Sequence, residues 1–151
     1  MQEFPHHYHV TTHAEATGDI VLTSTSLDPL RTQSPVEFGG PGDRWSPETL
    51  LTGAVGDCFA LTFRAVARAS RLPWTSLRCG VTGTLERVGS VPQFTGFDVV
   101  AHLEVPEGTS VEAAQEALER AERHCLVSSS LRGPVHLRAS VEASQPSPAF
   151  G

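Results

Sequence analysis

The chain has 151 residues, which is enough for one domain with a hydrophobic core. Its net charge of −6 at pH 7 and the lack of a basic cluster exclude a general nucleic-acid binder, and the lack of lysine excludes Schiff-base chemistry. Asp57 and Arg64 interrupt the longest apolar run, and the N-terminal M-Q-E-F-P-H-H holds no signal segment. We therefore expect a cytoplasmic protein without a membrane span, whose three cysteines are reduced.

Short strands separated by turns are predicted for the N-terminal part of the chain. Residues 9–16 alternate and are followed by T-G-D, which indicates a strand and a turn. Residues 20–25, I-V-L-T-S-T, indicate the next strand. The density of Pro and Gly over residues 34–43 predicts a loop.

A long helix is predicted to follow this loop. Ser46 suits the N-cap, Pro47 the first helical position, and Glu48 the positive end of the helix dipole. Apolar residues then recur at intervals of three and four, which predicts a helix from about residue 47 to about residue 70. Leu72-Pro73 ends it.

The C-terminal part of the chain predicts a hairpin followed by a second helix. Residues 75–88 and 93–105 indicate two long strands joined by the turn G89-S-V-P-Q. Thr109 and Glu112 form a capping box, so we expect a helix over residues 111–124.

A final strand completes the predicted fold. Residues 134–142 alternate, and the last residues, 143–151, indicate a frayed tail. The order of elements predicts an α+β fold, in which antiparallel sheets accompany a long central helix and a second helix. We expect a single domain over 1–151 with a core of about 10–142.

Two cysteines lie in complementary settings. Cys58 lies inside the long helix, and Cys125 lies at the end of the second helix, in E122-R-H-C-L-V-S128. Such thiols can form a peroxide-reducing pair, in which one becomes a sulfenic acid and the other resolves it as a disulfide. Two buried structural cysteines are the alternative, because the spacing alone carries no motif. Cys79, in a strand, is interpreted as a packing residue.

The sequence resembles the OsmC/Ohr family of organic hydroperoxide reductases. The resemblance rests on S46-P-E-T-L-L-T-G-A-V-G-D-C-F-A-L-T-F63 and on H124-C-L-V-S-S-S-L131. The family has a Pro-Glu-x-Leu-Leu helix start, a cysteine ten residues after that Glu, and a second Cys-x-Val-Ser near the end. The order and spacing of elements agree over about residues 10–142.

The resemblance implies both a mechanism and an assembly. It implies that Cys58 attacks an organic hydroperoxide, that Cys125 resolves the intermediate, and that Glu48 orients an arginine beside the thiolate. It also implies an OsmC-like fold, an intertwined homodimer with composite active sites, and no cofactor. An external dithiol, such as the dihydrolipoyl group of a lipoylated protein, would return the disulfide to two thiols.

Helix geometry bears on the role of Glu48. Glu48 and Cys58 are ten residues apart, so their backbones differ by ~15 Å along one helix axis. If they share a site, either Glu48 meets the thiol of a partner chain, which we favour, or an arginine bridges them. An ordinary first-turn acid that complements the helix dipole is the alternative.

The activating arginine is where the chain departs from the family pattern. One branch of the family has it ten residues before the glutamate, where this chain has Phe38, and the other has it in the first hairpin, which holds no arginine over residues 18–27. Arg44 is our first candidate, ahead of Arg31, although a surface pair of Arg44 with Asp43 is an open alternative. The departure favours a second interpretation, in which the chain binds an apolar ligand or senses redox state without peroxidase activity.

The N-terminal histidines are candidate metal ligands. His6, His7, His9 and His13 cluster near the N-terminus, but no carboxylate or cysteine accompanies them at a useful spacing. We therefore expect no physiological metal.

Overall fold

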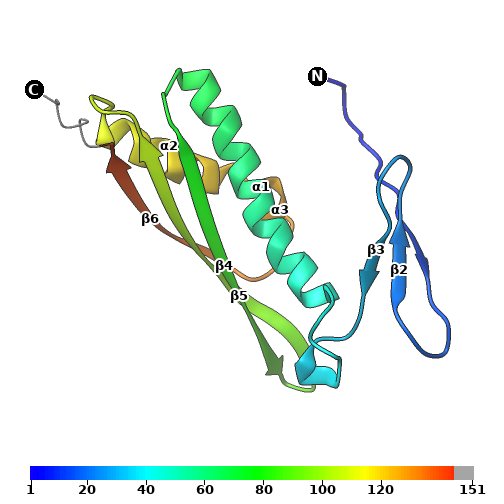
Figure 1. Cartoon of the computed structure of the whole chain (residues 1–151). Coiled ribbons are helices and arrows are strands. Elements are labelled where there is room, and N and C mark those ends of the chain that lie inside the picture. The colour runs from blue at the N-terminus through cyan, green and yellow to red at the C-terminus, as the bar shows by residue number, and fades with distance from the viewer. Residues whose placement is uncertain (145–151) are drawn as a thin grey trace, which may run out of the picture. The chain divides into compact units, whose positions relative to one another are not determined.

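The computed structural model describes residues 1–144 (Figure 1), so the predicted tail lies outside the described residues from position 145 onward. The chain divides into two compact units, Met1–Leu51 and Thr52–Gly151. The prediction of one OsmC-like domain over the whole chain stays a prediction.

The N-terminal unit contains a small antiparallel sheet. Its strands are β1 (Thr11–His13), β2 (Ile20–Thr23) and β3 (Leu30–Thr32), in the order β1-β2-β3. The first two strands agree with the prediction, whereas β3 was not predicted. A single 3-10 turn, η1 (Val36–Phe38), lies within the predicted loop. The predicted loop is therefore present, but it contains a 3-10 turn that was not predicted.

Helix α1 (Pro47–Ser70) has the predicted bounds. The Ser46 side chain accepts a hydrogen bond from the Thr49 N–H at 3.1 Å, as expected of an N-cap. At the other end Arg71 adopts a left-handed backbone conformation with φ of 54°. The Leu72 N–H then bonds the Ala67 carbonyl at 2.9 Å, which closes the last turn before Pro73.

One stripe of α1 is buried. Its buried residues, spaced four apart, are Val55, Phe59, Phe63 and Ala67. The helix is long and apolar enough to cross a membrane by length and composition, but the core helix of a soluble protein passes the same test. This property of α1 is therefore weak evidence for a membrane span.

The C-terminal unit contains a second sheet. Strands β4 (Ser76–Val88) and β5 (Val91–Val105) form the predicted antiparallel hairpin, and β6 (Val135–Ala143) lies on the other side of β5. The turn is shorter than predicted, because Val88 already pairs with Val91 and only Gly89 and Ser90 connect the strands. Strand β6 runs parallel to β5, so this sheet is mixed, unlike the antiparallel sheet expected.

Helix α2 (Val111–Arg123) is capped by a different residue from the one predicted. The Ser110 side chain, and not that of Thr109, accepts the N-cap hydrogen bond, from the Ala113 N–H at 3.1 Å. A short helix that was not predicted, α3 (Leu126–Ser129), follows Cys125.

The core of the C-terminal unit lies between the helices and one face of the β4-β5-β6 sheet, as Figure 1 shows. Helix α1 packs closely on β4, since a Cβ added at Gly56 would meet the Val81 side chain at 3.0 Å. Helix α2 runs beside β6. The buried residues of β5 alternate along the strand: Phe97, Val99, Ala101, Leu103 and Val105. The opposite face of this sheet carries the intervening residues of β5, which are polar apart from the exposed Val100.

Candidate active site

The fold brings the two predicted thiols together. Cys58 lies on α1 and is half-buried, whereas Cys125 lies between α2 and α3 and is 1% exposed. The Cys58 side chain lies close enough to Cys125 to influence the pKa of the Cys125 thiol. They are separated by more than sixty residues in sequence, so the packing of α1 against the C-terminal segment creates this contact.

The surroundings of Cys125 hold it as a neutral thiol. Burial raises the pKa of Cys125, hydrogen bonds from Ser128 lower it in part, and the contact with Cys58 raises it again. The Ser128 hydroxyl lies 3.3 Å from the Cys125 sulfur and donates to it. Because burial is the largest of these effects, the thiol form of Cys125 is favoured.

Thr62 lies beside Cys58 on the next turn of α1. Its hydroxyl donates to the Cys58 carbonyl at 2.7 Å and lies 3.9 Å from the Cys58 sulfur. A hydroxyl has one hydrogen, so while Thr62 bonds the carbonyl it cannot also donate to a Cys58 thiolate. Stabilisation of a Cys58 thiolate must therefore come from another group.

Arg44 takes part in an ion-pair cluster within the N-terminal unit. Its Nε donates to a carboxylate oxygen of Asp19 at 3.1 Å, and a terminal nitrogen lies 3.7 Å from the Asp43 carboxylate. These hydrogen bonds and charges raise the pKa of Arg44. The pairing with Asp43 that the sequence left open is thus present, and Asp19 adds a partner that sequence reasoning missed.

Asp19 is the centre of that cluster. The pKa of Asp19 is lowered, first by a hydrogen bond from Gln33 and then by Arg44. Gln33 donates to it at 3.1 Å, and Arg31 lies 3.7 Å from it. The T-G-D turn was visible in the sequence, but nothing there indicated that two arginines would share its carboxylate.

Glu48 and Cys79 lie at different places in the fold. Glu48 lies in the first turn of α1, half-buried, with its Oε2 atom shielded from solvent. Cys79 lies on β4 opposite Ala101, on the core side of the sheet. Burial raises the pKa of Cys79 to about 11. These surroundings of Cys79 agree with a packing role.

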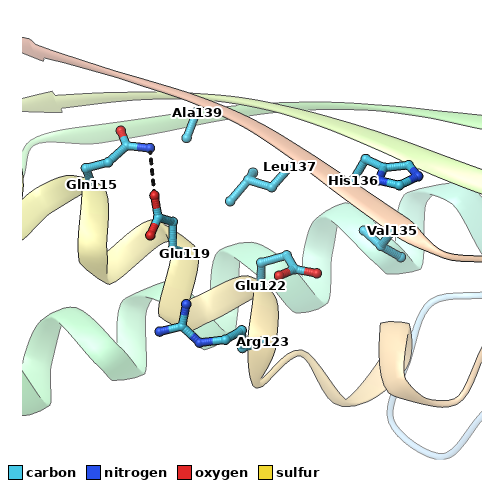
Figure 2. A pocket seen from close by; sticks show the side chains of 8 residues that line it. All are labelled: Gln115, Glu119, Glu122, Arg123, Val135, His136, Leu137 and Ala139. Atoms are coloured by element: carbon cyan, nitrogen blue, oxygen red, sulfur yellow. Dashed lines mark hydrogen bonds between the residues drawn. The ribbon is translucent and has the colours of Figure 1, made fainter.

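A surface pocket of the C-terminal unit lies elsewhere, between α2 and β6 (Figure 2). It has a volume of about 410 Å³ and combines charged side chains of α2 with half-buried apolar ones of β6. Neither thiol is among its described lining residues, which are Gln115, Glu119, Glu122, Arg123, Val135, His136, Leu137 and Ala139. This pocket is therefore a feature of α2 and β6 and is not formed by the thiol pair.

Comparison with known proteins shows which protein family the chain matches. The family model for OsmC-like proteins matches residues 40–140. An uncharacterized protein of Bacillus subtilis, YmaD, is 26% identical over 127 residues, covering 82% of this chain and 79% of that protein.

Solved structures share the fold. An OsmC-like protein of unknown function from Vibrio cholerae superposes with a TM-score of 0.82 at 12% identity, covering 90% of this chain and all (100%) of that one. An organic hydroperoxide resistance protein OsmC from Legionella pneumophila has a TM-score of 0.71 at 24% identity, covering 92% and 98%. Since the family match spans more than half of the sequence, including both Cys58 and Cys125, this chain belongs to the OsmC-like protein family.

Proposed function

We propose that this protein is a thiol peroxidase that reduces organic hydroperoxides. The observation that carries the proposal is the contact between Cys58 and Cys125 in a chain of the OsmC-like family. The Legionella protein of the same fold is named for organic hydroperoxide resistance, which agrees with this activity. The roles of the individual residues are part of the proposal.

The reaction uses both thiols and no cofactor. The Cys58 thiolate attacks the terminal oxygen of the hydroperoxide, the O–O bond breaks, and the alkoxide leaves and takes up a proton as the alcohol. Cys58 is then a sulfenic acid. The Cys125 sulfur attacks the Cys58 sulfur, a disulfide forms, and the hydroxyl leaves as water. An external dithiol, such as a dihydrolipoyl group, reduces this disulfide and becomes a disulfide itself.

Burial supports this division of roles. The attacking group must be a thiolate that the substrate can reach. Cys58 is half-buried, whereas Cys125 is 1% exposed and its pKa is raised. The proposal therefore keeps Cys58 as the attacking thiol and Cys125 as the resolving one. It also keeps Arg44, our first candidate from the sequence, as the activating cation. Glu48 remains the residue that orients the arginine, as the resemblance implies.

A cytoplasmic homodimer is part of the proposal. Of the 24 residues of α1, four are buried within the single chain, and Leu61 on the same helix is 52% exposed. A second copy that covered this apolar helix would remove further apolar surface from water. Sedimentation equilibrium at micromolar concentration tests this, with a dimer as the expected species and a monomer as the contradicting one.

Steady-state turnover tests the activity. Consumption of cumene hydroperoxide should depend on dihydrolipoamide and should fall to background in Cys58→Ser. Cys125→Ser should also lose turnover, because its sulfenic acid is not resolved. Cys79→Ser is the matched control, because it changes a cysteine of the same unit without touching the pair, and it should keep wild-type turnover. Turnover that survives in Cys58→Ser would refute the proposed reaction.

A redox sensor or apolar-ligand binder is the second candidate. The specific observation in its favour is that Asp19 and Asp43 already pair with Arg44, so the charge of the candidate cation is offset. This candidate keeps the two thiols but predicts a peroxide reaction no faster than that of a free thiol. The same turnover assay separates the two candidates.

A further inference from the structure

Three potential metal ligands converge on the outer face of the second sheet. They are His102 and Glu104 on β5 and Glu142 on β6, and one ligand atom from each lies within 4.8 Å of the others. The cluster lies on the opposite face of the sheet from the core and from α1, which carries Cys58. It is therefore separate from the thiol pair.

The strand register explains the convergence. Residues 102 and 104 share a face because side chains alternate along a strand. Parallel pairing of β5 with β6 then places Ser140 beside His102 and Glu142 beside Glu104. The carboxylates of Glu104 and Glu142 lie at neighbouring positions and repel each other. On the β4 side, Glu104 lies opposite Ser76, which carries no charge. A bound cation would offset this repulsion.

The hydrogen bonds of His102 suit a metal ligand. Its Nδ1 lies 2.9 Å from the Ser140 hydroxyl, and its Nε2 lies 3.1 Å from a carboxylate oxygen of Glu142. If Nδ1–H donates to Ser140, the lone pair of Nε2 points toward the carboxylates, where a cation can replace the proton. The Ser76 hydroxyl donates to Glu104 at 3.0 Å and positions that carboxylate in the same way.

We propose that His102 Nε2 and one oxygen each of Glu104 and Glu142 bind a single Zn²⁺ ion. Zinc takes imidazole and carboxylate ligands at about 2.0–2.2 Å, which places tetrahedral ligand atoms roughly 3.4 Å apart. The 3.1 Å separation of His102 and Glu142 already fits this spacing, and rotation of the exposed Glu104 side chain completes it. Water fills the fourth position, as in other zinc sites with three protein ligands.

The imidazole selects the class of ion. Mg²⁺ and Ca²⁺ prefer oxygen ligands, whereas imidazole suits zinc and the neighbouring transition metals. Arg78 lies opposite His102 on β4, so the site is not a purely acidic patch that attracts any cation. The sequence alone does not indicate this cluster, because Glu142 lies 40 residues after His102 and only the parallel pairing of β6 with β5 brings them together.

Isothermal titration of the reduced full-length protein with Zn²⁺ tests the proposal. His102→Gln and Glu142→Gln should each remove one binding event or weaken the Zn²⁺ affinity by more than ~100-fold. That loss is larger than the loss expected when a residue that only positions a ligand is changed. Ser140→Ala should weaken the Zn²⁺ affinity by about 10-fold, because Ser140 only positions His102. His136→Gln is the matched control, because His136 lies on the same exposed face of β6 outside the cluster, and it should bind like wild type.

Cysteines and the N-terminal histidines can also bind zinc, so a second readout identifies the ligands. Co²⁺ bound at the proposed site should give d–d absorption, without thiolate charge transfer, that is lost in both cluster variants. Mg²⁺ should give no binding event that depends on His102. Unchanged Zn²⁺ binding in His102→Gln and Glu142→Gln, both folded by circular dichroism, would overturn the proposal. Equal loss in His136→Gln, or equally tight binding of Mg²⁺, would do the same.

Discussion

Cys58 and Cys125 present the same chemical group in two different environments. Cys125 is almost fully buried, and burial raises its pKa, so it reacts best with a partner already in contact with it. Cys58 is half-buried, and its neighbour Thr62 directs its hydroxyl to a carbonyl. The proposal assigns the stabilisation of a Cys58 thiolate to the positive charge of Arg44.

Neutralising Arg44 tests that assignment. Arg44→Gln should slow the reaction of Cys58 with cumene hydroperoxide at pH 7 by about 10-fold, because a nearby cation that lowers a thiol pKa by one unit raises the thiolate population tenfold. The rate is measured by stopped flow under single-turnover conditions. Arg31→Gln is the control, since Arg31 also pairs with Asp19, and its rate should stay within about twofold of wild type.

Other reaction rates in the two arginine variants would contradict the role assigned to Arg44. Equal rates in Arg44→Gln and wild type would show that Arg44 serves only its ion pairs with Asp19 and Asp43. Equal slowing in both variants would point to the integrity of the Asp19 cluster and away from a specific cation.

Helix α1 packs on the β4–β5 hairpin with little free space at Gly83. A Cβ at Gly83 would lie 2.8 Å from the Thr52 hydroxyl and 2.9 Å from the Phe97 ring. Gly83→Ala should therefore lower the free energy of unfolding by about 1–3 kcal/mol, the usual cost of overpacking a core. Urea denaturation followed by circular dichroism measures this change.

Gly80 provides the matched substitution on the same strand. Nothing lies within 4 Å of a Cβ added there, and the residue is exposed. Gly80→Ala should raise the free energy of unfolding by about 0.5 kcal/mol, because alanine loses less backbone entropy on folding. Equal destabilisation by both substitutions would contradict the packing described for Gly83.

Elements with several agreeing signals could be predicted from the sequence. Helix α1 has an N-cap, a proline at its first position and a long apolar period, and its bounds were predicted correctly. Strand β3 is three residues long, which is too short for alternation to be seen. The N-cap of α2 was assigned one residue early because Thr109 and Ser110 are both good caps and only their backbone geometry separates them.

At the scale of the whole molecule, the chain has no lysine, so lysine titration does not contribute to the change of stability at alkaline pH. Burial raises the pKa of Cys79 to about 11 in the folded protein. The neutral thiol is thus favoured by folding, and its contribution to stability is complete below the unfolded pKa of ~8.5 and is lost as pH rises through 11.

Cys79→Ala should flatten the alkaline decline in stability. The free energy of unfolding of the wild type, from urea denaturation under reducing conditions, should fall between pH 9 and 11 more steeply than that of the variant. A variant that is less stable at every pH would only reflect the lost packing of the sulfur. Parallel declines in the two proteins would contradict the assignment of this titration to Cys79.

Contacts between residues that are far apart in the sequence are the part of the structure that local sequence patterns could not predict. Resemblance to the family predicted the Cys58–Cys125 pair, and the contact between the thiols agrees with it. The sequence spacing of Cys58 and Cys125 alone could not have predicted the pair, because the distance between the two thiols depends on how α1 packs against the segment after α2. The pairing of Arg44 with Asp19 and the convergence of His102 with Glu142 likewise arise from strand pairing across long separations.

A stopped-flow thiol count with peptide mapping tests the central claim most directly. The reduced wild-type protein, mixed with cumene hydroperoxide, should lose two thiols per chain in one fast phase and yield a disulfide between Cys58 and Cys125. Cys125→Ser should lose one thiol and accumulate a sulfenic acid at Cys58. Thiol loss no faster than that of a free cysteine, or a disulfide that includes Cys79, would contradict the proposed peroxidase mechanism.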